Sequence, residues 1–114
     1  MIIEVLPTLN TVEVYSNPVA APLLLKMEAK SQGFDAYIQN AYVVDTSSTS
    51  VDAVLPALPK KGDTVEFVCL GANSLNILRN SHNINKEASD LTIVSGESAL
   101  LRYLDSTFGW VRFR

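Results

Sequence analysis

The side chains that could carry out acid–base or nucleophilic chemistry are few. His82 is the only histidine and lies in a polar stretch, residues 80–83, that is typical of a solvated loop. A catalytic base needs a nucleophile within hydrogen-bond reach, and no serine of the chain has the glycine spacing of a nucleophile elbow. We therefore predict a surface loop position for His82 and a protein that is not an enzyme.

Cys69 is the only cysteine, so no disulfide can form within the chain and no Cys/His cluster can hold a metal. It lies in the apolar run of residues 64–70, where a thiol stays protonated and unreactive. A chain without disulfides is stabilised by packing alone, which is typical of proteins made in a reducing cytoplasm. We predict a buried Cys69 and no metal or other cofactor.

The carboxylates do not form a recognisable pair. Asp63 lies in a turn, Glu66 on the outward side of a predicted strand and Asp90 just before another strand. Glycoside hydrolysis needs two carboxyl groups that face each other across a cleft, and nothing in the sequence brings two of these residues together. The five glycines occur singly at turns, which is unlike a phosphate-cradling loop.

The composition indicates one compact domain with a packed core. Of 114 residues, 47% are hydrophobic, which is enough to bury a core and argues against disorder. The net charge of −3 argues against a nucleic-acid partner. Neither a membrane span nor a signal peptide is expected. Charged residues make up 18%, below the roughly 25% usual in soluble domains, which favours a surface buried against copies or partners.

Short β-branched runs separated by turn residues predict an all-β fold, a small antiparallel β-sandwich or barrel. Residues 22–32 are the stretch that could instead form one short helix, because Pro22 suits a first helical turn and Gly33 can end it. Leu23 and Leu25 fit one face of a strand equally well. The predicted strands are residues 2–6, 11–15, 37–45, 51–55, 64–70, 75–79, 91–94, 99–104 and 110–113.

Alternation along the predicted strands indicates which side is buried. Val65, Phe67 and Cys69 share one face of their strand, which is wholly apolar and is expected to face the core. The last two strands form a hairpin around the five-residue loop 105–109. Apolar side chains occur on both faces of this hairpin, which fits an interior strand or one covered by another subunit.

Several strand and turn motifs follow one another in a set order from residue 42 onwards. They are YVVDTSS (residues 42–48), VLP (54–56), GDTVEFV (62–68), LNI (75–77), ASDLTI (88–93) and FGW (108–110). In this order and spacing they resemble a β-module of tailed-bacteriophage virion proteins. That module has a V-D-T-S strand, an L-P-x-x-P link, a G-D-x-V-x-F strand and a Y-G-W-R ending. The likeness covers about residues 42–113, and the loop 80–86 departs from the commoner glycine-rich turn.

The resemblance implies a non-enzymatic structural protein of the virion. Such modules occur in tail fibres, neck appendages and head decorations, commonly as oligomers. The resemblance favours a trimer. Here the module, residues 42–114, stands almost alone after the unmatched residues 1–41, within one compact domain. This favours a capsid decoration or stabilising protein over a tail or neck-fibre component. The expected partners are the major capsid protein or tail and neck proteins, with no nucleic acid and no membrane.

Two groups of side chains are predicted to contact subunits or partners. Aromatic residues concentrate in the last dozen positions, and such anchors often dominate core or interface energetics. The N-terminal residues 1–25 are expected to extend onto a partner or to pair with a partner's sheet edge. The predicted contact residues are Leu23, Leu24, Leu25, Tyr103, Phe108, Trp110 and Phe113.

A carbohydrate-binding module for host glycans is the alternative function. An exposed Trp110 or Tyr103 could stack on a sugar ring. A core or interface position is the competing interpretation of the same two aromatic residues.

Overall fold

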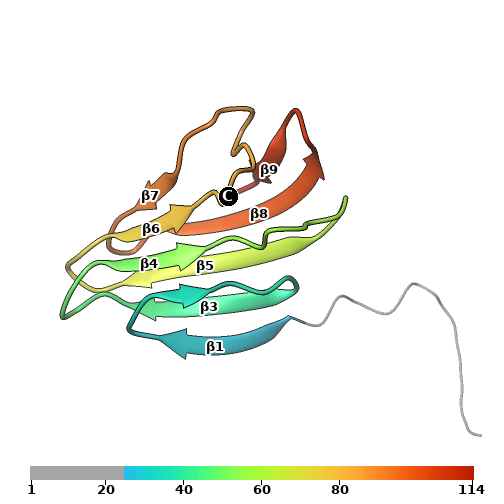
Figure 1. Cartoon of the computed structure of the whole chain (residues 1–114). Coiled ribbons are helices and arrows are strands. Elements are labelled where there is room, and N and C mark those ends of the chain that lie inside the picture. Colours follow the sequence, from blue (N-terminus) through green and yellow to red (C-terminus); the bar gives the residue numbers. More distant parts are fainter. Residues whose placement is uncertain (1–24) are drawn as a thin grey trace, which may run out of the picture.

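The computed structural model describes residues 25–114, which form nine β-strands and no helix (Figure 1). The strands make two sheets whose buried side chains form one core, so the prediction of a small all-β sandwich is confirmed. Sheet A has the order β1 (Lys26–Lys30), β3 (Asn40–Asp45), β5 (Thr64–Leu70), β8 (Ser98–Asp105) and β9 (Gly109–Arg112). Sheet B has the order β2 (Phe34–Asp35), β4 (Val51–Val54), β6 (Leu75–Leu78) and β7 (Leu91–Ile93).

The first six strands wind as a coil. Successive strands alternate between the two sheets, and each lies parallel to the strand two positions earlier. Parallel neighbours need a long connection, and here that connection passes through the opposite sheet. The predicted antiparallel pairing is therefore wrong for these strands, because the turns move the chain to the other sheet instead of reversing it within one.

Antiparallel strands follow the coil at its C-terminal end. β7 pairs with β6, β8 with β5 and β9 with β8. β8 lies between β5 and β9, so the apolar residues on both its faces belong to an interior strand, as predicted. The β8–β9 loop is shorter than the predicted five residues, because Asp105 pairs with Gly109 across an irregularity after Tyr103.

The short helix considered for residues 22–32 is wrong over its described part, where β1 occupies Lys26–Lys30. β1 pairs with β3 at five successive positions. Sheet pairing overrides the helix propensity of the Leu, Met, Glu, Ala and Lys side chains in this stretch. The positions that lie outside the described residues are Leu23, Leu24 and the predicted strands 2–6 and 11–15.

The core is formed by the alternate, inward-facing residues of both sheets. Val65, Phe67 and Cys69 are fully buried, as predicted. The Cys69 thiol lies 3.4 Å from the Thr46 hydroxyl, so it packs as a small buried group. Trp110 on β9 is the largest fully buried side chain. Because the inward residues are fixed in this core, the residues between them are held on the outer faces of the two sheets.

Candidate functional site

A row of polar side chains crosses the outer face of sheet B. Asp52, Asn76 and Thr92 lie in register across β4, β6 and β7, beside the outward apolar pair Val54 and Leu78. Asn76 Nδ2 donates a hydrogen bond to Asp52 Oδ1 at 2.9 Å, and Thr92 Oγ1 donates one to Asn76 Oδ1 at 3.1 Å. Such a ladder of cross-strand polar pairs suits a sheet face that stays in water.

The outer face of sheet A is mainly apolar. Two rows of outward side chains cross β1, β3, β5 and β8, and β9 and the residue after it extend the surface. Three of the residues that define this surface are polar, and Thr64, Asp45 and Leu70 point to the same side at the ends of their strands. We define the sheet A outer face by Met27, Ala29, Ala41, Val43, Glu66, Val68, Ser98, Leu100, Arg102, Val111 and Phe113.

In the edge strand β1, the outward residues are apolar and the charged residues point to the core-facing side. Met27 points outward and is 73% exposed. Lys26, Glu28 and Lys30 lie in register with buried residues of β3, so they share the core-facing side of the sheet. Lys30 Nζ lies 3.2 Å from Glu28 Oε1 and 5.5 Å from the centre of the Phe34 ring. Inward-pointing charges protect a sheet edge from indiscriminate pairing, while the outward apolar residues remain available for contact.

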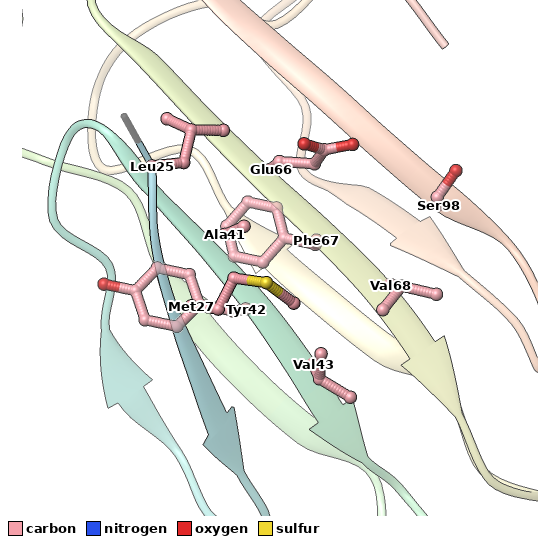
Figure 2. A pocket seen from close by; sticks show the side chains of 9 residues that line it. All are labelled: Leu25, Met27, Ala41, Tyr42, Val43, Glu66, Phe67, Val68 and Ser98. Carbon is pink, nitrogen blue, oxygen red and sulfur yellow. The ribbon is translucent and has the colours of Figure 1, made fainter. Parts of the chain in front are cut away.

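A shallow groove of about 300 Å³ crosses the sheet A outer face at the β1–β3–β5 end (Figure 2). Leu25, the first described residue, lies at this groove, so the chain enters the fold beside it. Most of the outward side chains in the lining are aliphatic, which suits another apolar surface better than a charged ligand, and Tyr42 and Phe67 lie behind them on the core side. The lining residues are Leu25, Met27, Ala41, Tyr42, Val43, Glu66, Phe67, Val68 and Ser98.

A second apolar depression, of about 260 Å³, lies on the same face over β8 and β9. Its wall includes Leu104, Val111 and Phe113, and Phe113 is 62% exposed. The Arg102 guanidinium carbon lies 5.7 Å from the centre of the Phe113 ring. The two depressions make the sheet A outer face an uneven apolar surface on which a complementary partner can fit.

One ion pair lies on the sheet A outer face. Arg114 Nη2 lies 3.2 Å from Glu66 Oε2. The Arg114 side chain is mostly exposed, so the pair contributes at most about 1 kcal/mol to stability. Its consequence for the surface is that the Glu66 carboxylate, which lies among these apolar residues, has a cationic partner.

The predicted contact residues fall into three groups. Leu25 and Phe113 line the two depressions, and Phe108 is 41% exposed in the β8–β9 loop. Tyr103 and Trp110 belong to the core instead. The remaining two, Leu23 and Leu24, lie outside the described residues. Sequence reasoning missed the surface made by Met27, Ala41, Val43 and Val68.

His82 contacts the backbone of a neighbouring loop and an aromatic ring of the core. Its Nε2 lies 2.7 Å from the Ala57 carbonyl oxygen, and its ring meets Tyr103 edge-on at 5.5 Å between centres. Tyr103 in turn meets Trp110 at 5.5 Å. His82 is in a surface loop, as predicted, where it is half-buried and joins the loop to the aromatic part of the core.

The carbohydrate-binding alternative depended on an exposed aromatic ring. Trp110 is fully buried and Tyr103 is 9% exposed. Neither ring presents a face on which a sugar could stack. The structure therefore removes the residues on which that alternative was based.

Residues 25–114 contain no group of three or more His, Cys, Asp or Glu side chains placed to hold a metal ion. The same part of the chain contains no helix that is long and apolar enough to cross a membrane. A scan against protein-family models and a search of curated proteins found no match to this chain.

Asp45, at the end of β3, links stability to pH. Hydrogen bonds from the Ser47 hydroxyl and from the Ser47 backbone N–H, the latter at 3.0 Å, hold the pKa of the Asp45 carboxyl below its ordinary value of 3.8. A carboxyl with a lowered folded-state pKa stabilises the fold above its unfolded pKa and loses that contribution as the pH falls through its folded pKa. We expect Asp45→Asn to reduce the pH dependence of thermal unfolding below about pH 4. Parallel melting-temperature curves for the two proteins would contradict this assignment.

Proposed function

We propose that the chain is a non-enzymatic structural protein of a bacteriophage virion, a capsid decoration or stabilising protein that assembles through the sheet A outer face. The observation that carries the proposal is the contrast between the two sheets, a polar ladder on sheet B and an apolar surface on sheet A. The resemblance of residues 42–113 to virion β-modules supports the assignment to a virion. A protein that binds a partner through one sheet and exposes the other sheet to solvent needs one apolar and one polar face.

In this role the protein acts passively. The sheet A outer face packs against neighbouring subunits or the capsid surface, and the polar ladder of sheet B stays in solvent. Five strands about 4.8 Å apart, each about 20 Å long, give a flat footprint of about 500 Å². A standard interface buries about 800 Å² of accessible surface per partner, which is of the same order as this face. Repeated copies on a symmetric shell raise the effective affinity.

A charge on the sheet A outer face should prevent assembly. Val68 lies half-buried in the middle of β5, facing outward. We expect the unaltered chain to have a solution mass near three times 12.4 kDa by light scattering. Val68→Lys should weaken this association by about 100-fold or more, because an ammonium group would have to be buried unpaired.

Thr92→Lys, on the outer face of sheet B, is the matched control and should leave the mass unchanged. If Val68→Lys associates as strongly as the control, the sheet A outer face is not the contact surface. Retained circular dichroism spectra show that neither variant has unfolded.

The virion role itself is tested with particles of the phage that encodes the chain. Purified protein should co-sediment with capsids that lack it, at a saturating number of copies that repeats with the shell symmetry. Binding confined to tails or necks would move the protein to the runner-up role of a tail or neck component. No binding to any particle would refute the proposal.

A further inference from the structure

The two depressions of the sheet A outer face differ in charge. Of the described residues that line the groove at the β1–β3–β5 end, Glu66 alone is charged, and its carboxylate faces Arg114. The depression over β8 and β9, called here the β8–β9 depression, is lined instead by two cations, Lys61 and Arg102. Because the whole chain carries a net charge of −3, two cations beside one apolar depression run against the average charge of the molecule.

Both cations are placed beside this depression by local contacts. The Gly62 N–H donates a hydrogen bond to the Tyr103 carbonyl oxygen at 2.9 Å, which fastens the turn that contains Lys61 to β8. The Arg102 guanidinium carbon lies 5.7 Å from the centre of the Phe113 ring, within the range of a cation–π contact. The backbone of Lys61 and the head group of Arg102 therefore have defined places next to the apolar wall.

The carboxylates nearest in sequence are used elsewhere. Asp63 Oδ2 accepts a hydrogen bond from a backbone N–H of its own turn at 2.7 Å. Asp105 Oδ1 accepts two from backbone N–H groups of the β8–β9 loop, at 2.9 and 2.8 Å. Within residues 25–114, neither Lys61 nor Arg102 forms an ion pair. The positive charge of the depression is thus not balanced by the part of the chain that the structure describes.

Covering the sheet A outer face creates a need for a counter-charge. A cation that leaves water without a partner is strongly unfavourable. A neutral or basic partner surface would leave Lys61 and Arg102 unpaired when it covered the β8–β9 depression. An ion pair that a partner covers is also less screened by salt than an exposed one. Charge complementarity therefore favours an acidic partner surface at this point.

This inference rests on the proposed function, in which a partner covers the sheet A outer face. We propose that the β8–β9 depression binds an acidic segment of the partner protein, in which a large apolar side chain stands next to Asp or Glu. The apolar side chain occupies the depression of about 260 Å³ against Leu104, Val111 and Phe113. The neighbouring carboxylate pairs with Lys61 or Arg102.

Titration of the full chain with two capped dipeptides, followed by NMR, tests this chemistry. Acetyl-Phe-Asp-amide has an apolar ring next to a carboxylate, and acetyl-Phe-Asn-amide has nearly the same shape without the charge. Both should shift the backbone amide resonances of Gly62, Leu104 and Val111, with Kd values in the millimolar range. The Asp dipeptide should bind at least about 3-fold more tightly, and this preference should decrease as salt is added.

Variants of the two cations show where the preference comes from. Lys61→Gln combined with Arg102→Gln should remove the preference for the Asp dipeptide and leave the weaker binding of the Asn dipeptide. The matched control is Lys60→Gln, because Lys60 precedes Lys61 and lines a different depression, and it should keep the preference. Equal affinities of the unaltered chain for the two dipeptides, or resonance shifts confined to other parts of the molecule, would overturn the proposal.

The titration is separable from the test of association. Val68 does not line the β8–β9 depression, so the titration is repeated on Val68→Lys, in which neighbouring subunits should not cover it. A preference for the Asp dipeptide in a chain that neither associates nor binds particles would refute the proposed function and support the depression as a site. Association with no such preference in either protein would do the reverse.

An anionic lipid surface is the other partner that an apolar depression with positive charge could meet. Vesicles of phosphatidylglycerol test it by co-sedimentation. Binding to these vesicles that is abolished by Lys61→Gln with Arg102→Gln, together with no response to either dipeptide, would overturn the protein partner in favour of a lipid.

Discussion

Gly109→Ala will destabilise the protein by about 3 kcal/mol or more, whereas Gly96→Ala will cost about 1 kcal/mol. Both glycines have positive φ angles, 70° at Gly109 and 85° at Gly96, so an alanine is strained at either position. They differ in the space around them. A Cβ on Gly109 would collide with the backbone of Asn83, while a Cβ on Gly96 would meet nothing within 4 Å.

The close approach at Gly109 has a structural purpose. The Trp110 N–H donates a hydrogen bond to the Asn83 carbonyl oxygen at 2.8 Å, and the Asn85 N–H donates one to the Trp110 carbonyl oxygen at 2.7 Å. These bonds fasten the loop that contains Asn83 and Asn85 to β9, and an alanine at position 109 forces them apart. Thermal unfolding should show a fall in melting temperature of about 12 °C or more for Gly109→Ala. Equal falls for the two variants would contradict the role of Asn83.

Trp110→Ala will cost about 3–5 kcal/mol, because a fully buried indole leaves a large cavity. The exposed Phe113 is the matched control on the same end of the chain, and Phe113→Ala should change stability by less than about 1 kcal/mol. Trp110 Nε1 is buried with no hydrogen-bond partner among the described residues. Trp110→Phe therefore loses area but no hydrogen bond, and should cost less than Trp110→Ala.

The comparison of Trp110 with Phe113 is best made by denaturant unfolding followed with circular dichroism, since Trp110 is the only tryptophan and its fluorescence is lost in the variant. A small loss of stability for Trp110→Ala would mean that the residue is not part of the core. It would also restore Trp110 as a candidate for contact with a partner or a sugar.

Local sequence pattern predicted β5 with its observed bounds and its buried face. The turn residues before Thr64 mark the start of the strand, and the alternation of Val65, Phe67 and Cys69 with less buried residues marks its core side. β2 was missed because two residues are too few to show alternation. The parallel coil could not be predicted, since a turn of three to five residues is compatible with a reversal within one sheet or a step to the other.

The candidate surface could be predicted only in part. Thr64, Glu66, Val68 and Leu70 occupy the second face of β5, and two of these four are apolar, which is more than a fully solvated face usually carries. Its extent depends on which strands lie beside β5, and that is decided by contacts between residues far apart in the chain. The same dependence explains the aromatic residues near the C-terminus, where Trp110 is buried and Phe113 is exposed although both are in or next to one short strand.

The parallel coil also constrains how the chain folds during synthesis. β5 is the middle strand of sheet A, and it pairs with β3 on one side and β8 on the other. Thr64 pairs with Arg102, so the second side of β5 has no partner until residues 98–105 have left the ribosome. The local β8–β9 hairpin is made after β1 to β7, and its strand β8 is the one that covers β5. The nascent coil thus carries β5 with one open side until β8 is made, and an open strand side of this kind can pair with the wrong strand.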